Sequence, residues 1–521
     1  MSITKSIIII GAGIGGLSAA IRLAAQGYRV QILERQPQVG GKLNQLKHAG
    51  FSFDTGPSLL TMPSVLKDLF AAAGRRLEDY LDLVPLDPTC RYFYRDGVTL
   101  NAWCDRTRLA NECARLNPAD GEALLRFLDD AHEIYQAAAD PFLYHSLGSP
   151  LDVLRTFVRY VLRGHASALP DDGSTIGQRL RAVLAALSPM TLDRSVRSYF
   201  IDEHLRQLFD RYATYNGSSP YRLASVYNII PYVEMAGGGW YPRGGIYTLA
   251  EALEKVAREL GVRIETRCDV RRILVERGEA RGVVLADGVV RRCDIVIANS
   301  DVVTTQRELL SPAVRSERLV RRLERLEPSC SGFVLLLGTD RLYPALAHHN
   351  IFFSDDYPAE FDDLFTYRRP LRNPTIYVCA TTRSDPSQAP TGHENLFVLV
   401  NAPYLTSSSN WQEEAPAYRE HILNLLASYK GIDLDDLREH IVCESMMTPL
   451  DFQQRYGANA GSIYGLSSNA RLAPFTRPGN RARDIRGLYF VGGSTHPGGG
   501  VPLVMLSGKI VAELVAEDAA I

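Results

Sequence analysis

The feature that most constrains the fold is a glycine-rich segment near the start of the chain. Residues 7–10 are a continuous run of isoleucine, and GAGIGG follows at residues 11–16. A run of β-branched residues is typical of a central parallel strand that is covered on both faces. After the glycines, apolar residues recur at helical spacing as far as Gly27, and a second strand-like segment occupies residues 30–33. This order predicts a βαβ unit with a tight glycine turn between the first strand and the helix.

The glycine segment matches the pattern G-x-G-x-x-G, which is typical of dinucleotide-binding proteins. Glycines at these positions allow the backbone to approach a pyrophosphate, and the helix that follows presents N–H groups to the phosphates. Glu34 ends the second strand, where a carboxylate accepts hydrogen bonds from an adenosine ribose. We therefore expect a bound dinucleotide, and the alternative is a glycine-rich turn without a ligand. The predicted contacts in this unit are Gly11, Gly13, Ile14, Gly15, Gly16 and Glu34.

Further glycine segments favour FAD over a nicotinamide dinucleotide. VGGK at residues 39–42 and FDTGPS at residues 53–58 resemble the second phosphate and ribityl contact region of amine-oxidase-like flavoproteins. GLYFVGGSTHPGGGVP occupies residues 487–502 and precedes a helical run. A helix that begins near Pro502 would direct its positive N-terminal end at the flavin pyrimidine ring and stabilise the reduced, anionic form. Because no second strand, G-x-G-x-x-G turn and helix are visible, we expect no separate NADPH domain.

Composition narrows the class of protein further. The 521 residues are 46% apolar and 22% charged, and the formal net charge of -2 provides no general attraction to nucleic acid. The eight cysteines are scattered without a CxxC pair or metal-like spacing, so we expect neither a metal site nor a disulfide framework. No apolar stretch reaches the length of a membrane span. These properties predict a cytoplasmic globular protein and leave its oligomeric state open.

The expected fold class is α/β, with a Rossmann-like FAD-binding domain built on a parallel sheet and a mixed α+β substrate domain that carries a helical insertion. We assign residues 1–75, 225–305 and 460–521 to a discontinuous FAD-binding domain. Residues 76–224 show helical periodicity without strand alternation and are expected to form the helical, membrane-facing insertion. Residues 306–459 mix strands and helices and are expected to form the substrate domain.

Several motifs together resemble the bacterial phytoene desaturase family. Besides the glycine segments they are DEHLRQ at residues 202–207, RYATY at residues 211–215 and WYPRGG at residues 240–245. The resemblance spans nearly the whole chain, and THPG at residues 495–498 is its most specific element. It implies that FAD is held by the residues already named and by further residues of the glycine turns. These further contacts are Arg35, Gly41, Lys42, Gly56, Ser58, Leu59, Val270, Asn299, Gly493, Gly500 and Val501.

The same resemblance implies an FAD-dependent desaturase that introduces double bonds into a carotenoid or a carotenoid precursor, a phytoene- or neurosporene-type C40 polyene or a C30 analogue. Without an NADPH site, oxygen or a membrane quinone would reoxidise the flavin. A carotenoid oxygenase or ketolase, an isomerase or a saturase would share this flavin site. A non-catalytic lipid-binding protein similar to GDP-dissociation inhibitors and Rab escort proteins would share the fold.

Three side chains are candidates for steering the proton or the charge of the desaturation. His496 lies in the C-terminal glycine turn, and Glu234 and Arg243 flank the glycines of residues 237–239. A strong base is not required, because an allylic cation is delocalised along a polyene. The alternatives are a capping turn residue for His496, a solvated loop carboxylate for Glu234 and a structural ion pair for Arg243.

One segment of the insertion suggests contact with a membrane surface. Its apolar residues fall on one helical face, and its arginines recur at every fourth position. Such a helix lies on the anionic inner face of a membrane with its arginines at the head groups, or it packs on the core as an ordinary surface helix. The apolar residues are Leu151, Leu154, Val158 and Val161, and the arginines are Arg155, Arg159 and Arg163.

Overall fold

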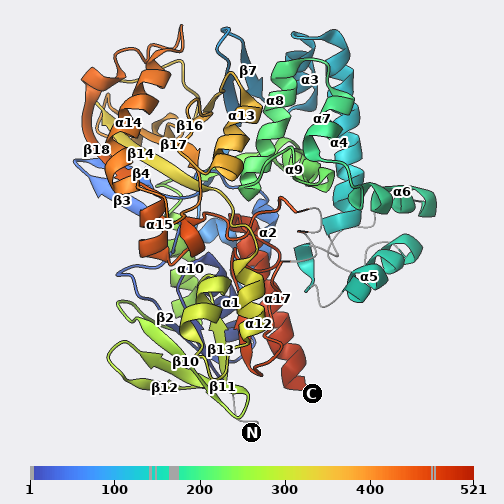
Figure 1. Ribbon diagram of the computed structural model, residues 1–521, viewed down its shortest axis with the longest axis vertical. Helices are drawn as coiled ribbons and strands as arrows, with labels where there is room; N and C mark the ends of the chain where they lie inside the picture. Colours follow the sequence, from blue (N-terminus) through green and yellow to red (C-terminus); the bar gives the residue numbers. More distant parts are fainter. Residues whose placement is uncertain are drawn as a thin grey trace.

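The computed structural model describes residues 5–139, 143–146, 150–163, 175–470, 473 and 477–520. Figure 1 shows three parts: a parallel sheet near both chain ends at the bottom of the view, a mixed sheet with helix α14 (Trp411–Ala427) at the upper left, and a group of helices at the upper right. The two ends of the chain therefore meet in the same part of the molecule.

The structure contains the predicted βαβ unit. β1 (Ser6–Ile10), α1 (Ile14–Ala25) and β2 (Arg29–Leu33) follow one another, and β2 pairs in parallel with β1. β1 is the central strand of a five-stranded parallel sheet with the order β19-β13-β1-β2-β9. The remaining strands of this sheet are β9 (Arg263–Glu265), β13 (Ile295–Ala298) and β19 (Leu488–Phe490).

Different layers cover the two faces of the parallel sheet. Ile7 and Ile9 pack against α1 and two further helices, one of them at the C-terminal end of the chain. Ile8 and Ile10 belong to a separate core that includes a three-stranded antiparallel sheet. Every isoleucine of β1 is therefore buried, which explains the lack of alternation in this segment. The covering elements are α10 (Thr248–Glu259), α17 (Val501–Ala520), β10 (Val270–Glu276), β11 (Glu279–Leu285) and β12 (Val290–Arg292).

A seven-stranded mixed sheet forms the second part, with the order β18-β14-β17-β16-β15-β6-β7. α14 packs on it, with Trp411 fully buried against Phe333. Its strands and the helix that covers it lie largely within residues 306–459, where a mixture of strands and helices was expected. The bounds are β6 (Cys90–Phe93), β7 (Thr99–Ala102), β14 (Ser331–Thr339), β15 (His349–Phe352), β16 (Ile376–Cys379), β17 (Glu394–Ala402) and β18 (Ile441–Met447).

The segment 76–224 differs from the expectation at its start, where strands precede the helices. β5 (Leu83–Leu86), β6 and β7 have four residues each, which is too short for strand alternation to be recognised. β6 is held in place by parallel pairing with β15, a partner far along the chain. The helices that follow are α3 (Arg106–Ala114), α4 (Pro118–Ala139), α5 (Pro150–Arg163), α6 (Ile176–Ala186), α7 (Leu192–Tyr199), α8 (Glu203–Asp210) and α9 (Ile229–Gly237).

Smaller elements connect these parts. β3 pairs with β4, and β5 pairs with β8 next to the glycines that follow α9. Their bounds and those of the remaining helices are β3 (Gln45–His48), β4 (Phe51–Asp54), β8 (Gly239–Pro242), α2 (Pro63–Ala72), α11 (Val302–Thr304), α12 (Glu317–Glu324), α13 (Tyr357–Asp362) and α15 (Pro449–Tyr456).

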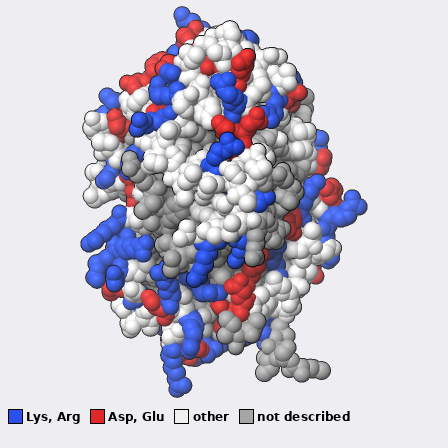
Figure 2. Space-filling model, turned by 90° about the vertical axis from the view of Figure 1, so that its right-hand side faces the viewer, with Lys and Arg blue, Asp and Glu red and all other residues white. Residues whose placement is uncertain are grey.

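Helices α5 and α6 form a projecting pair with apolar side chains on the outside. They pack against each other through a small core that contains Phe157, Tyr160 and Val183. Figure 2 views the molecule from the side that carries them and shows uncharged described residues near the middle of this face, with both basic and acidic side chains around them. Within the described ranges, no helix is both long and apolar enough to cross a membrane. The exposed apolar residues of the pair are Leu154, Val158, Leu162, Ile176, Leu180 and Leu184.

Candidate functional site

A cavity of about 650 Å³ opens where the parallel strands end. Its wall combines the turns after β1 and β19 with the ends of β2 and β13, which is the edge where parallel α/β sheets bind ligands. Residues from both ends of the chain therefore meet at one site. The predicted contacts that line it are Gly11, Gly13, Ile14, Gly15, Glu34, Arg35, Gly41, Lys42, Gly56, Ser58, Leu59, Val270, Asn299, Gly493, Gly500 and Val501.

The turn after β1 fits a phosphate-bearing ligand. Gly13 is the N-cap of α1 and provides no side-chain hydrogen bond, so the first N–H groups of the helix can bind an anion. A Cβ atom on Gly16 would lie 2.3 Å from the carbonyl oxygen of Gly11, so this position requires glycine. Gly16 is not part of the described cavity wall. Its lack of a side chain instead allows α1 to pack closely on the turn.

Glu34 holds this turn from the end of β2. Its carboxylate accepts hydrogen bonds from the N–H of Ala12 at 2.7 Å and from the N–H of Gln36 at 2.8 Å. Burial raises the pKa of the Glu34 carboxyl, and the two backbone N–H groups act in the opposite direction. The carboxylate is therefore fixed in position at the cavity wall, where it fits the ribose contact expected of it.

Lys42 places a buried amine in the same wall. Its Nζ donates hydrogen bonds to the carbonyl oxygens of Ile463 at 2.6 Å and Ser462 at 3.1 Å. Burial lowers the pKa of Lys42 to about 8, while the charge of Asp301 acts in the opposite direction. A cation at this position suits a ligand that carries phosphate.

The turn after β19 brings a second helix N-terminus to the cavity. Gly493, Gly500 and Val501 line it at the start of α17, and a Cβ atom on Gly500 would meet no atom within 4 Å. Asn299 lies between the two glycine turns and donates from Nδ2 to the carbonyl oxygen of Gly11 at 3.3 Å. Two helix N-termini, a fixed carboxylate and an amine thus converge on one cavity, and this set of donors and acceptors fits FAD.

Beyond the glycine turns the same cavity continues between the mixed sheet and the insertion. There its wall is largely hydrocarbon and aromatic, which suits the remainder of a long apolar ligand. The wall residues of this inner part include Val334, Ile351, Tyr357, Phe397, Leu399 and Ile463.

A chain of hydrogen bonds runs along one side of the inner cavity. The Ser58 hydroxyl lies 2.5 Å from the hydroxyl of Tyr377, which lies 2.8 Å from Nδ1 of His349. Burial lowers the pKa of His349 well below its usual value, so this imidazole is neutral. Its Nε2 atom is buried and has no hydrogen-bond partner in the described part of the chain. The sequence alone did not identify Tyr377 or His349 as residues of the site.

Glu234 lies in the cavity wall on α9, with 1% of its surface exposed. Its carboxylate accepts hydrogen bonds from the hydroxyls of Tyr215 at 2.5 Å and Tyr212 at 2.8 Å. Burial raises the pKa of Glu234, whereas these hydroxyls and the charge of Arg211 lower it. The alternative of a solvated loop carboxylate is therefore wrong for Glu234.

The other two catalytic candidates do not line the described cavity. His496 is 3% exposed, and its Nε2 donates to the carbonyl oxygen of His145 at 3.0 Å. Arg243 is on the surface and forms an ion pair with Asp82 at 2.9 Å. The position of Arg243 agrees with the alternative of a structural ion pair, whereas the His496 side chain contacts His145 and does not cap the last helix.

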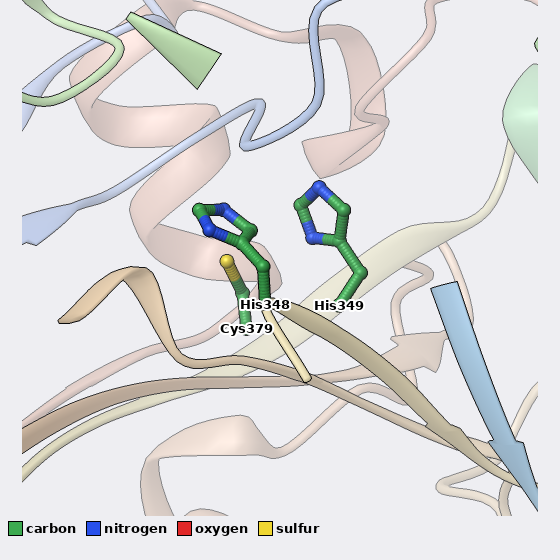
Figure 3. Close-up of side chains that lie close together, drawn as sticks. All are labelled: His348, His349 and Cys379. Carbon is green, nitrogen blue, oxygen red and sulfur yellow. The ribbon is translucent and has the colours of Figure 1, made fainter. Parts of the chain in front are cut away.

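A cysteine and two histidines meet at the cavity wall, which His349 lines, although their sequence spacing gave no indication of it. His348 directly precedes β15, His349 begins it and Cys379 ends β16, where His349 and Cys379 are direct antiparallel partners. One ligand atom from each residue lies within 4.8 Å of the others. Figure 3 shows the two rings side by side, with the sulfur near the His348 ring. Nδ1 of His348 also lies 2.8 Å from the Ser384 hydroxyl, so each ring has one nitrogen in a hydrogen bond.

The fold and the site define an FAD-dependent oxidoreductase. The chain belongs to the flavin containing amine oxidoreductase family, whose sequence model matches residues 14–516. Solved structures with little sequence identity share the fold. An oxidoreductase from Methanosarcina mazei matches with a TM-score of 0.63 at 20% identity over 98% of this chain and 100% of that chain. Cyclohexylamine oxidase from Brevibacterium oxydans matches with a TM-score of 0.61 at 17% identity over 100% of both chains.

Relatives with higher identity agree with the resemblance to carotenoid desaturases. A 4,4'-diapolycopene oxygenase from Methylomonas is 39% identical over 99% of this chain and 98% of that protein. A zeta-carotene-forming phytoene desaturase from Myxococcus xanthus is 36% identical over 98% of this chain and 93% of that protein. Both likenesses extend over the whole site, including the inner cavity.

Proposed function

We propose that this chain oxidises a long apolar polyene of the carotenoid type and introduces double bonds into it. The observation that carries the proposal is the continuity of one cavity from the two glycine turns into the hydrocarbon wall formed by residues such as Val334, Ile351 and Leu399. A polyene in the inner part would place its carbon chain against the cofactor. The names of the relatives support a carotenoid as the substrate class.

The chain's own residues have three tasks in this reaction. The hydrocarbon wall excludes water and aligns the polyene, which favours the reaction by fixing the reacting carbons. FAD supplies the hydride acceptor when it is bound. Glu234 is a buried carboxylate of the inner cavity wall with a raised pKa, and we assign to it the uptake of the proton that leaves the neighbouring carbon.

The experiment is expression in a host that makes phytoene, neurosporene or a C30 analogue, followed by chromatography and mass spectrometry of the pigments. Loss of pairs of hydrogen atoms from one precursor is the expected result. Unchanged pigment with every precursor would contradict the proposal.

An oxygenase is the second candidate, because the inner cavity also contains polar groups such as Glu234 and His349 that a pure hydrocarbon does not need. Gain of oxygen in the product mass would identify this reaction. For the desaturase, oxygen or a quinone would reoxidise the cofactor, and oxygen consumption by the purified enzyme with substrate would separate these two acceptors.

We also propose that helices α5 and α6 bind the surface of an anionic membrane, the inner face of the cytoplasmic membrane. Leu154 is 58% exposed and Leu184 61% exposed, and the exposed arginines Arg155 and Arg159 lie on the same helix pair. Apolar side chains bordered by arginines match the composition of an interfacial helix. Val161 instead packs partly against the core of the pair, and the side chains of Leu151 and Arg163 lie outside the described residues.

Sedimentation with phosphatidylglycerol vesicles tests this membrane proposal. The double substitution Leu154→Ser and Leu184→Ser should reduce the bound fraction several-fold, because each substitution removes apolar surface that the membrane would bury. Val289→Ser with Val290→Ser changes two exposed valines at the start of β12 and should leave binding unchanged. Equal binding of all three proteins would contradict the proposal.

A further inference from the structure

The most unusual group in the inner cavity is the guanidinium of Arg211. Arg211 follows α8 directly, lines the cavity and is surrounded by tyrosine rings. Its guanidinium carbon lies 5.4 Å from the ring centre of Tyr215 and 6.0 Å from those of Tyr92 and Tyr212. Aromatic rings at these distances stabilise the positive charge of the guanidinium. They do not provide the oxygen or nitrogen acceptors that its N–H groups need.

Arg211 has no hydrogen-bond or ion-pair partner for its side chain among the described residues, and its Nη1 atom is fully buried. The charge of Glu234 acts on Arg211, but the hydrogen bonds that its carboxylate accepts come from the hydroxyls of Tyr212 and Tyr215 and not from the guanidinium. A guanidinium is charged at all physiological pH values and carries five N–H donors. Leaving such donors without acceptors inside a protein is unfavourable, so a ligand that enters the cavity is expected to bring an acceptor.

Two neighbouring polar atoms share this property. The hydroxyl of Tyr92 and Nε2 of His349 are buried without a partner in the described structure. Arg211 and His349 line the same cavity, and the ring centre of Tyr92 lies 6.0 Å from the guanidinium carbon of Arg211. The inner cavity wall therefore carries a guanidinium nitrogen of Arg211 and a ring nitrogen of His349 that are buried without partners in the described structure, beside apolar side chains such as Leu399. Such a wall suits an oxygen atom on an apolar molecule.

We propose that Arg211 binds an acceptor oxygen, as an aldehyde or a carboxylate, at the end of the polyene. This inference rests on the proposed function and makes it more specific: the substrate or the product carries an oxidised end group. A plain hydrocarbon would leave the Arg211 donors unsatisfied and would bind less well. Arg211 is thus a specificity-determining residue of the site.

The test is a binding titration of the FAD-loaded enzyme with three polyenes of equal length, a hydrocarbon, its terminal aldehyde and its terminal carboxylate. The wild-type enzyme should bind at least one oxidised form about 10-fold more tightly than the hydrocarbon, as expected for a hydrogen bond to a charged group. Arg211→Met should remove this preference and leave hydrocarbon binding within a factor of about 3. Arg211→Lys keeps the charge and should retain part of the preference.

Arg222→Met is the matched control, since Arg222 pairs with Glu327 outside the described cavity wall, and it should behave as wild type. Equal binding of the three polyenes to the wild-type enzyme would overturn the inference without any variant. Loss of FAD from Arg211→Met, with Arg222→Met unaffected, would also overturn it, because Arg211 would then serve the cofactor. If no polyene binds the wild-type enzyme, the proposed function fails together with the inference.

Discussion

Glu34 shows how one side chain prepares a binding site. Its carboxylate accepts hydrogen bonds from Ala12, in the glycine turn, and from Gln36, beyond β2. These two bonds fix the backbone of the glycine turn and of the segment that follows β2. The same carboxylate faces the cavity, so the shape of the turn and the recognition of the ligand depend on one residue.

Glu34→Gln should weaken FAD binding. The amide replaces one acceptor oxygen with an NH2 group, which would face a backbone N–H at Ala12 or Gln36. Losing a hydrogen bond to a charged group costs about 1.5–3 kcal/mol, so we expect the dissociation constant to rise about 10- to 100-fold. Flavin fluorescence during titration of the apoprotein measures it. Gln45→Ala, on β3, is the control, and equal affinity of Glu34→Gln and wild type would show that the carboxylate has no role in binding.

Glu234→Gln tests the assignment of the proton acceptor. The amide keeps the size of the side chain and one acceptor oxygen for the tyrosine hydroxyls, but it cannot take up a proton. We expect turnover to fall about 100-fold or more, the usual contribution of a general base, while FAD remains bound. Single-turnover bleaching of the flavin absorbance measures the rate. A rate close to wild type would mean that the polyene loses its proton to water or to another group.

At the level of elements, the close crossing of α1 and α17 determines where both helix N-termini point. A Cβ atom on Gly508 would lie 2.7 Å from Cβ of Ser18 and 2.8 Å from the backbone nitrogen of Ala19. The two helices can pack this closely only because small residues meet at the crossing. Since both N-termini line the cavity, the crossing links the packing of the chain ends to the site.

Gly508→Ala should therefore destabilise the protein. Overpacking at this position is expected to cost about 1–3 kcal/mol and to move α17 away from α1. Gly177→Ala in α6 is the matched control, because a Cβ atom there meets nothing within 4 Å and alanine favours a helix. Thermal unfolding measures the midpoint of both variants. Relative to wild type, we expect a lower midpoint for Gly508→Ala and an unchanged or higher midpoint for Gly177→Ala. A midpoint for Gly508→Ala at or above wild type would rule out a tight crossing.

Local signals account for what the sequence predicted correctly about these elements. The glycine turns, Glu34 and the C-terminal turn are each encoded within a few neighbouring residues, and sixteen of the predicted contacts line one cavity. The inner pocket depends on distant pairing instead, because β6 lies beside β15 and brings Cys90 and His349 into one cavity wall. Arg211 was visible only as part of the RYATY motif, whose residues showed no chemical pattern of their own.

At the level of the whole molecule, the burial of neutral histidines makes the stability of the fold depend on pH. Burial lowers the pKa of His348 to about 3 and that of His496 to about 4. In the unfolded chain the same side chains titrate near the ordinary value of about 6.5. Between these values the unfolded chain binds protons that the folded protein does not, so acid favours unfolding.

The sign of this effect predicts that the contribution of these histidines to stability is fully present above about pH 6.5 and falls as the pH decreases toward 4. Each such histidine contributes about 1.4 kcal/mol per pH unit in that range. His496→Gln keeps an N–H donor for the carbonyl oxygen of His145 and cannot be protonated, so its unfolding midpoint should fall less steeply with pH than that of wild type. His48→Gln, at an exposed position on β3, should follow the wild-type curve. Differential scanning fluorimetry with excess FAD from pH 8 to 4 measures how steeply the unfolding midpoint of the three proteins changes with pH. Identical slopes for His496→Gln and wild type would mean that His496 becomes protonated without unfolding the chain.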